Sequence, residues 1–269
     1  MKKYHPKLHE VHENARNSAG SKFLRECPWG SSAEISGLVE RALVESYTNV
    51  FGRGVEPSGQ QLGILNNSVS QRLITLRSSI RDKIQTGVEK FYSNQLASLA
   101  EDERDDYLAG LASSDDGFYF FHYKRWEGPN KKGKSGAFLH PSIAGAIQLA
   151  VFSHRKDFGY VNDLFPDSKV TKPFIAFICT AILHGLRVLK DSYDASDDTQ
   201  QEFSLARYRH HYNNLLAQIT TREGEGKLPS TPEYFSELFR TASWRWRRRE
   251  EPADRMRIQD RADSESDGE

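Results

Sequence analysis

Three histidines near the start of the chain have a spacing that metal sites use. His5, His9 and His12 follow one another at steps of four and three residues, which would place them on one face of a helix. Imidazoles in that arrangement can hold zinc or copper. Pro6 interrupts the pattern, and short histidine-containing tracts are only a compositional signal. We therefore interpret these residues as a solvated arm and expect no metal and no other cofactor.

Two arginines on one expected helix could bind an anion. Arg77 lies about 40° around the helix from Leu73, which belongs to the apolar stripe of that helix. A guanidinium on such a stripe needs an acid, a group of carbonyls or a bound anion, because an unpaired buried charge is costly. Two interpretations stay open: an internal ion pair, or an anion-binding arginine assisted by Arg81.

The C-terminal tail carries the strongest binding signal of the sequence. Arginine can hold phosphates through two N–H groups, and tryptophan can stack on bases. The same pattern is typical of a nuclear-import patch or of contact with another anionic surface, and Lys131, Lys132 and Lys134 could add to it. Acidic residues follow from Glu250 onward, so the run could equally be the solvated end of the last helix. The tail residues in question are Trp244, Arg245, Trp246, Arg247, Arg248 and Arg249.

No group of residues predicts a particular reaction. His140 stands directly before Pro141, which favours a helix cap over a catalytic base. Thr180, His184 and Arg187 form one polar line on an apolar helix, and we expect them to face solvent or a groove. The chain has no Walker loop, GxSxG, HExxH or EF-hand loop. We therefore assign no catalytic residue, and the question of an enzyme stays open.

The elements that must position these residues are expected to be helices. The clearest stripe recurs every three or four residues from Val69 to Phe91, with Gly87 on the same face, where another backbone could pack closely. Ser31 and Glu34 form a capping-box signature. The aromatic run 118–123 has no second strand nearby, so we expect a buried extended or irregular segment. The expected helices cover about 31–51, 69–91, 105–112, 141–152, 174–193, 204–219 and 231–239.

Composition indicates a soluble chain of 269 residues with 37 basic and 37 acidic residues and a mean hydropathy of −0.67. A protein that is basic throughout is excluded, so polyanion binding would need a local patch. The longest apolar run, 173–183, is too short to cross a membrane. The cysteines, Cys27 and Cys179, form no CxxC pair, which favours a reducing compartment. We expect the nucleus or the cytoplasm, because no apolar region follows the basic start.

These observations predict an all-α protein, a single globular multi-helix bundle with disordered N- and C-terminal arms. We place a disordered arm at 1–30, the helical domain at 33–240 and a basic, then acidic, flexible tail at 244–269. The oligomeric state is left open.

Several segments in serial order resemble a domain-of-unknown-function family abundant in mushroom-forming (basidiomycete) fungi. The resemblance covers roughly residues 35 to 240 and implies no known activity or ligand. The chain departs from the family in its loops, so no functional residue is carried over. The matching residues are Leu76, Arg77, Ile80, Arg81, Lys83, Val88, Glu89, Phe91, Tyr92, Gly136, Ala137, Phe138, His140, Pro141, Ile143, Thr180, Ala181, Ile182, Tyr208, Tyr212 and Leu215.

Three functions follow as hypotheses from the sequence. The first is a non-catalytic α-helical interaction module of a fungal intracellular protein, which binds another protein. The second is a nucleic-acid-associated nuclear protein that uses the Trp-Arg tail. The third is an enzyme with an interhelical site near Arg77 and His140.

Overall fold

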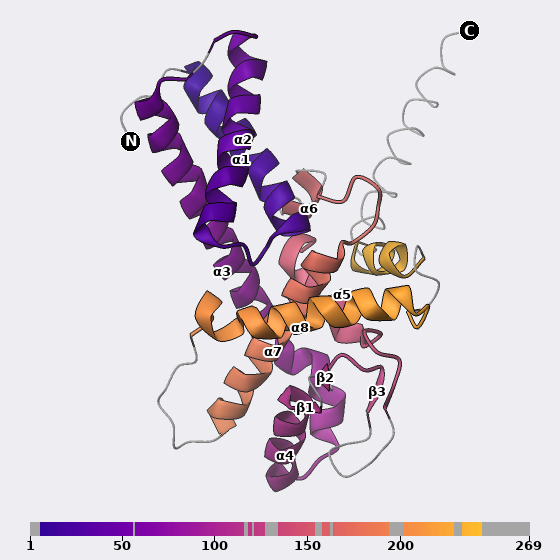
Figure 1. Cartoon of the computed structure of the whole chain (residues 1–269). Helices are drawn as coiled ribbons and strands as arrows, with labels where there is room; N and C mark the ends of the chain where they lie inside the picture. The colour runs from indigo at the N-terminus through magenta and orange to yellow at the C-terminus, as the bar shows by residue number, and fades with distance from the viewer. Residues whose placement is uncertain are drawn as a thin grey trace, which may run out of the picture.

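Helices make up most of the described part of the chain, which confirms the all-α fold class (Figure 1). The computed structural model describes residues 6–55, 57–115, 118–119, 121–126, 134–153, 158–161, 164–193, 202–228 and 233–243. The helices are α1 (Pro6–Glu26), α2 (Ser32–Phe51), α3 (Gly59–Ala97), α4 (Glu101–Ala112), α5 (Pro141–Val151), α6 (Phe158–Val161), α7 (Lys172–Tyr193) and α8 (Leu205–Gly224). A further helix covers 233–243.

Residues 6–26 correct the expected N-terminal arm, because they form the helix α1. Val11, Ala15, Ala19 and Phe23 recur every four residues and are fully buried, and α1 packs along α2 and α3. The Thr171 hydroxyl donates a hydrogen bond of 2.7 Å to the carbonyl of Arg25, which ties the end of α1 to the start of α7. The helical body therefore begins well before residue 33.

Side-chain caps determine where the next helices begin. The Ser31 hydroxyl accepts from the Glu34 amide, and the Glu34 carboxylate accepts from the Ser31 amide at 2.7 Å, so the expected capping box is confirmed. Ser58 and Gln61 make a second capping box. Because of it, α3 begins at Gly59, ten residues before the expected start, and runs the length of the body (Figure 1).

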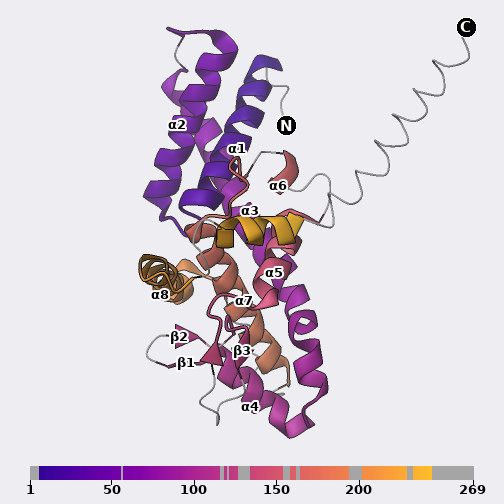
Figure 2. The same cartoon turned by 90° about the vertical axis from the view of Figure 1, so that its right-hand side faces the viewer.

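The apolar helix α7 lies at the centre of the body. It contacts α3, α4, α5 and α8, and Figure 2 shows α3 and α8 on opposite sides of it. Helices α1 and α2 with the first half of α3 form one end of the molecule, and α4 lies at the other end (Figures 1 and 2). The stretch Lys172–Ser192 is long and apolar enough to cross a membrane, but 72% of its apolar window is buried inside the protein, as in a core helix.

A glycine allows the close contact between α3 and α7, but it is not the glycine that the stripe indicated. A Cβ atom on Gly185 would lie 2.6 Å from Val88 Cγ2 and 3.4 Å from the Gln85 Cα atom. A Cβ atom on Gly87 would instead meet the end of the Leu149 side chain at 2.3 Å. The close backbone approach therefore occurs at Gly185, on α7.

Four two-residue strands lie between α4 and α5. They form two antiparallel pairs, and Ser114 faces Tyr119 in the first pair while Arg125 faces Ser135 in the second. The aromatic run thus does have a partner strand, which corrects the expectation for 118–123. Its described residues Tyr119, Phe121, His122 and Tyr123 are buried, as expected. The strands are β1 (Ser114–Asp115), β2 (Phe118–Tyr119), β3 (Arg125–Trp126) and β4 (Lys134–Ser135).

Candidate functional site

Arg77 on α3 lies against Trp29, in the loop between α1 and α2. The Arg77 Cζ atom is 5.4 Å from the centre of the Trp29 ring. Trp29 is only 3% exposed, and Arg77 is half-buried. Within the described residues, neither Arg77 Nη1 nor Trp29 Nε1 has a hydrogen-bond partner, although both atoms are buried. The predicted burial of Arg77 is thus observed, whereas the expected ion pair is absent from this part of the chain.

Aromatic rings from three other segments surround Trp29. Phe203 meets it edge-on at 4.8 Å, Tyr212 of α8 stacks on it at 6.0 Å, and Phe177 of α7 lies at 5.8 Å. Phe203 in turn lies under Arg81, whose Cζ atom is 5.8 Å from the ring centre. The two arginines that share one face of α3 therefore each cover an aromatic ring.

Two carboxylates near this group, those of Asp82 and Glu34, have other partners. The Asp82 carboxylate accepts from Arg81 at 2.6 Å. Glu34 accepts from the Ser31 amide and hydroxyl at 2.7 Å, and its contact with Arg209 is long, at 3.9 Å. Because these two carboxylates already bind other groups, the charge of Arg77 has no acidic partner within the described residues.

Below Arg81, polar side chains of α7 and α8 make a buried network. His184 Nδ1 lies 3.1 Å from the Tyr208 hydroxyl, and the Arg187 Cζ atom lies 5.6 Å from the Tyr208 ring centre. Arg187 Nη1 donates to His211 Nε2 at 3.0 Å. A neutral His211 then carries its proton at Nδ1, which is hydrogen-bonded to the Tyr119 hydroxyl. We call Trp29, Arg77, Arg81, His184, Arg187, Phe203 and Tyr208 the arginine–aromatic cluster.

Burial and positive charge keep both histidines of this network neutral. Burial, followed by the charges of Arg81, Arg207 and Arg187, lowers the pKa of His184 to about 4. Burial together with Arg187 lowers the pKa of His211 to about 3. The polar line Thr180, His184 and Arg187 was expected to face solvent or a groove, but Thr180 and His184 are buried. Their hydroxyl and imidazole groups therefore find partners inside the protein.

A second polar cluster lies where the segment 136–141 meets α3. His140 caps α5 by accepting from the Ser142 amide, as expected, and its ring stacks on Tyr92 at 4.9 Å. Phe138 adopts a left-handed φ of 59°, stacks on His122 at 4.1 Å and accepts from the Tyr234 hydroxyl at 2.7 Å. These side chains stack on one another or bond to the backbone and so hold the loop against the helices, and we assign them a structural role.

The remaining sequence candidates are distributed as follows. The tail residues 244–249 lie outside the described residues, as do Lys131, Lys132 and His5, and of Lys134 only the backbone in β4 is described. His12 contacts the Ser68 hydroxyl at 3.0 Å, and His9 is exposed on α1. Among the described residues, no three histidine, cysteine or acidic side chains gather as a metal site would require.

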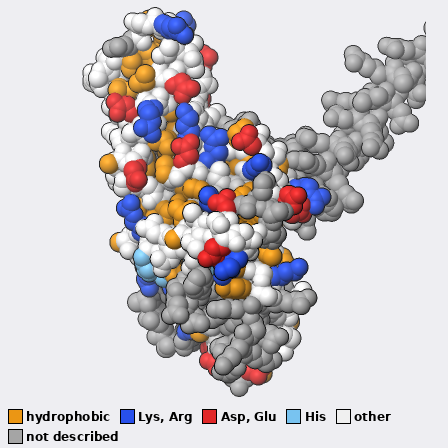
Figure 3. Space-filling view, turned by 45° about the vertical axis from the view of Figure 1, so that its right-hand side comes forward, with side chains coloured by type: hydrophobic (Ala, Val, Ile, Leu, Met, Phe, Trp, Pro, Cys, Tyr) orange, Lys and Arg blue, Asp and Glu red, His pale blue; other side chains and the backbone are white. Residues whose placement is uncertain are grey.

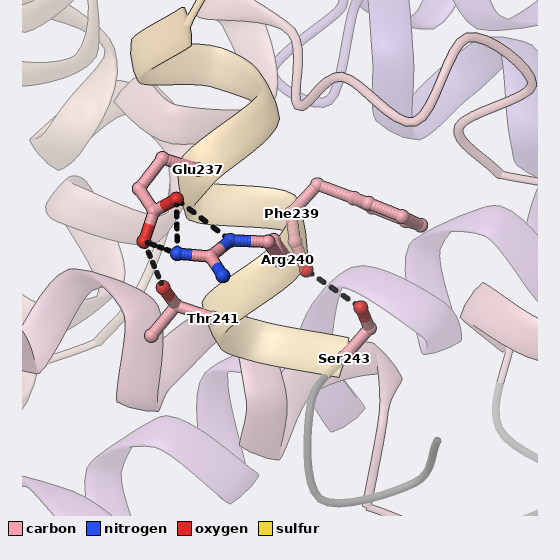
Figure 4. A network of polar contacts seen from close by, with 5 residues as sticks. All are labelled: Glu237, Phe239, Arg240, Thr241 and Ser243. Carbon is pink, nitrogen blue, oxygen red and sulfur yellow. Dashed lines mark hydrogen bonds and ion pairs between the residues drawn. The ribbon is translucent and has the colours of Figure 1, made fainter.

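Arg240, on the helix 233–243, shows what a fully paired arginine looks like in this protein (Figure 4). Its Nε and Nη2 atoms both donate to the Glu237 carboxylate at 2.8 Å. Glu237 also accepts from the Thr241 hydroxyl at 3.2 Å. Arg77 has no such partner among the described residues, and this contrast is what makes it a candidate binding residue.

Trp29 and Phe203 belong to no motif or apolar stripe in the sequence. Trp29 falls in the segment 1–30, for which the sequence predicts a disordered arm, and Phe203 falls in a polar linker before Ser204. The signal in the sequence is a lone aromatic residue in an otherwise polar segment. Such a residue indicates packing against the fold, because large rings tend to be buried. Only the fold brings these two rings to Arg77 and Arg81.

Comparison with known proteins identifies a family but no activity. A family model described as "Domain of unknown function (DUF6532)" matches residues 15–221. The match begins inside α1, in agreement with the helical body seen here. No curated protein and no solved structure shows a significant match to the chain.

Proposed function

Because the chain belongs to the family described as Domain of unknown function (DUF6532), whose description assigns no activity, we propose a function from the geometry. The protein is a non-catalytic α-helical module that binds an acidic segment of another protein through the arginine–aromatic cluster. We place it in the nucleus or cytoplasm of a fungal cell. The observation that carries the proposal is Arg77, half-buried beside Trp29 without an acidic partner in the described residues.

The charges around the cluster favour an acidic partner. Arg81, Arg187 and Arg207 all lie close enough to His184 to act on its pKa. Arg207 and Arg209 are exposed on the first turns of α8. Surface arginines beside aromatic rings are characteristic of protein interfaces, and such charges attract an oppositely charged partner.

Binding is favoured over acid–base catalysis by the state of the histidines. A general base works best when its pKa lies near the working pH. The pKa values of about 4 for His184 and about 3 for His211 are too low for that role at neutral pH. His140 is occupied as the cap of α5. The enzyme hypothesis therefore has the weaker support.

A peptide-binding experiment tests the proposal. A fluorescent glutamate-rich peptide should bind the full chain with an affinity that falls as salt rises, and the same peptide with glutamine in place of glutamate should not bind. Arg207→Glu should weaken binding, because it reverses a charge beside the cluster. Arg240→Glu is the matched control on a distant helix. Equal binding of both peptides, or equal loss with both variants, would refute the proposed function.

A further inference from the structure

Two buried donor nitrogens in the arginine–aromatic cluster are the candidates for a small binding site. Trp29 Nε1 and Arg77 Nη1 belong to one cation–π pair, with 5.4 Å between the Arg77 Cζ atom and the Trp29 ring centre. Both nitrogens are buried donors without an acceptor among the described residues. An N–H group that loses its water and gains no acceptor is costly to bury, so a ligand that supplies the acceptor regains that energy.

We propose that Trp29 and Arg77 together hold one carboxylate of the protein partner. This inference rests on the proposed function, since the acidic segment of the partner supplies the carboxylate. The half-buried Arg77 side chain gives access from the surface, whereas Trp29 lies deeper, at 3% exposure. The carboxylate oxygens would accept from the guanidinium and from the indole.

The number and charge of the donors favour a carboxylate over a phosphate. Among the described residues, the pair offers one positive charge and two buried donor nitrogens without an acceptor, which suit a group with a single negative charge and two oxygens. The second arginine of this face, Arg81, is already paired with Asp82 at 2.6 Å. A phosphate dianion would bring more charge and more acceptors than the site can satisfy.

Phe203 and Tyr212 keep the site specific by closing two sides of the Trp29 ring. Phe203 lies at 4.8 Å and Tyr212 at 6.0 Å, so water is excluded from those sides of the indole. An ion pair in such surroundings is screened less than one on the open surface. We therefore expect a carboxylate to be distinguished from a neutral amide of the same shape.

Nuclear magnetic resonance of the indole groups tests the inference on the full chain. The protein has four tryptophans, and Trp29→Phe identifies the signal of Trp29 by its loss. Propionate should shift that signal to saturation, while propionamide at equal ionic strength should leave it unchanged. Arg77→Met should weaken the propionate affinity about tenfold or more, as expected for a charge-assisted hydrogen bond. Arg240→Met should retain the wild-type affinity.

Each remaining outcome overturns a defined part of the inference. An unmoved Trp29 signal, or an equal shift with propionamide, removes the carboxylate site. An equal or larger response to inorganic phosphate overturns the choice of carboxylate. Binding of the glutamate peptide without a Trp29 shift refutes this site and leaves the proposed function standing. If propionate shifts Trp29 but the peptide does not bind, the site stands as a small-carboxylate site and the proposed function fails.

Discussion

At the scale of single residues, Arg77 differs from most arginines that are removed from solvent, because such arginines are usually paired with an acid. Had it been paired with a buried acid, Arg77→Leu would cost about 3 kcal/mol of stability, because the acid would stay behind unpaired. Among the described residues it has no such partner. Its burial is therefore a cost to the free protein, and that cost is what a ligand could relieve.

We expect Arg77→Met to change the free energy of unfolding by no more than about 1 kcal/mol, or to raise it. The variant loses the contact with Trp29, worth about 1 kcal/mol, and removes a buried donor that has no partner among the described residues. Denaturant unfolding measures the change. Leu73→Ala, one turn earlier and fully buried, is the control and should cost about 2–5 kcal/mol. A loss of about 3 kcal/mol or more in Arg77→Met would reveal an acidic partner that the described residues do not contain.

The buried histidines predict that the protein loses stability in mild acid. Burial lowers the pKa of His122 and His211 to about 3 and of His184 to about 4, whereas an unfolded histidine titrates near 6.5. The unfolded chain therefore binds more protons below that pH, and the free energy of unfolding falls as the pH falls. Three such groups should remove roughly 4 kcal/mol between neutral pH and about pH 5.5.

Denaturant titrations at a series of pH values test this prediction. His184→Asn should reduce the slope below about pH 6 by roughly 1.4 kcal/mol per pH unit, because one of the three groups no longer takes up a proton on unfolding. A free energy of unfolding that stays constant from pH 7 to about pH 5 would show that these histidines are not held neutral by the fold.

At the scale of elements, apolar stripes and caps predicted most of the helices. The helix α1 was not predicted, because its inner face contains small residues. The stripe that includes Leu73, Ile80 and Val88 is buried as predicted, and the Ser31 cap is confirmed. The inner face of α1 is built partly from Ala15 and Ala19, which contribute little to an apolar pattern. The cluster could not be predicted, because Trp29, Arg77 and Phe203 meet only through packing between distant segments.

We expect Phe23→Ala to destabilise the protein by about 3–5 kcal/mol, because it opens a cavity in the core. Phe23 is fully buried on α1, and α1 packs along α2. The neighbouring Lys22→Ala is the control: Lys22 makes an exposed ion pair with Glu45 at 3.2 Å, worth at most about 1 kcal/mol. Thermal or denaturant unfolding compares the two. Equal stability of both variants would show that this segment does not pack in the core, and would support the predicted disordered arm.

At the scale of the whole molecule, charge is balanced and interspersed. The chain carries 37 basic and 37 acidic residues, and on the face seen in Figure 3 the blue and red side chains alternate over the surface. Association with a charged partner must therefore come from local groups. The arginine–aromatic cluster in the fold is one such group, and the run from Arg245 to Arg249, which holds four arginines and no acid, is a second.

The two groups can be separated by testing nucleic acid against the tail. We expect a triple variant to bind a labelled single-stranded oligonucleotide more weakly than the wild type at low salt. The variant replaces Arg247, Arg248 and Arg249 with alanine. The affinity of the wild type should fall with rising salt by roughly one unit of log–log slope per phosphate neutralised. Removing 262–269, which contains four acidic and no basic residues, should strengthen binding.

Neither change touches α1 to α8, so circular dichroism and the glutamate-peptide affinity should stay at wild-type values. That combination would assign nucleic acid to the tail and the acidic protein partner to the cluster, because each ligand would then respond to its own arginines. Equal oligonucleotide binding by the wild type and the triple variant at low salt would exclude the tail. Because the net charge of the chain is zero, Arg77 beside Trp29, which has no acidic partner among the described residues, would then remain as the group that selects the partner.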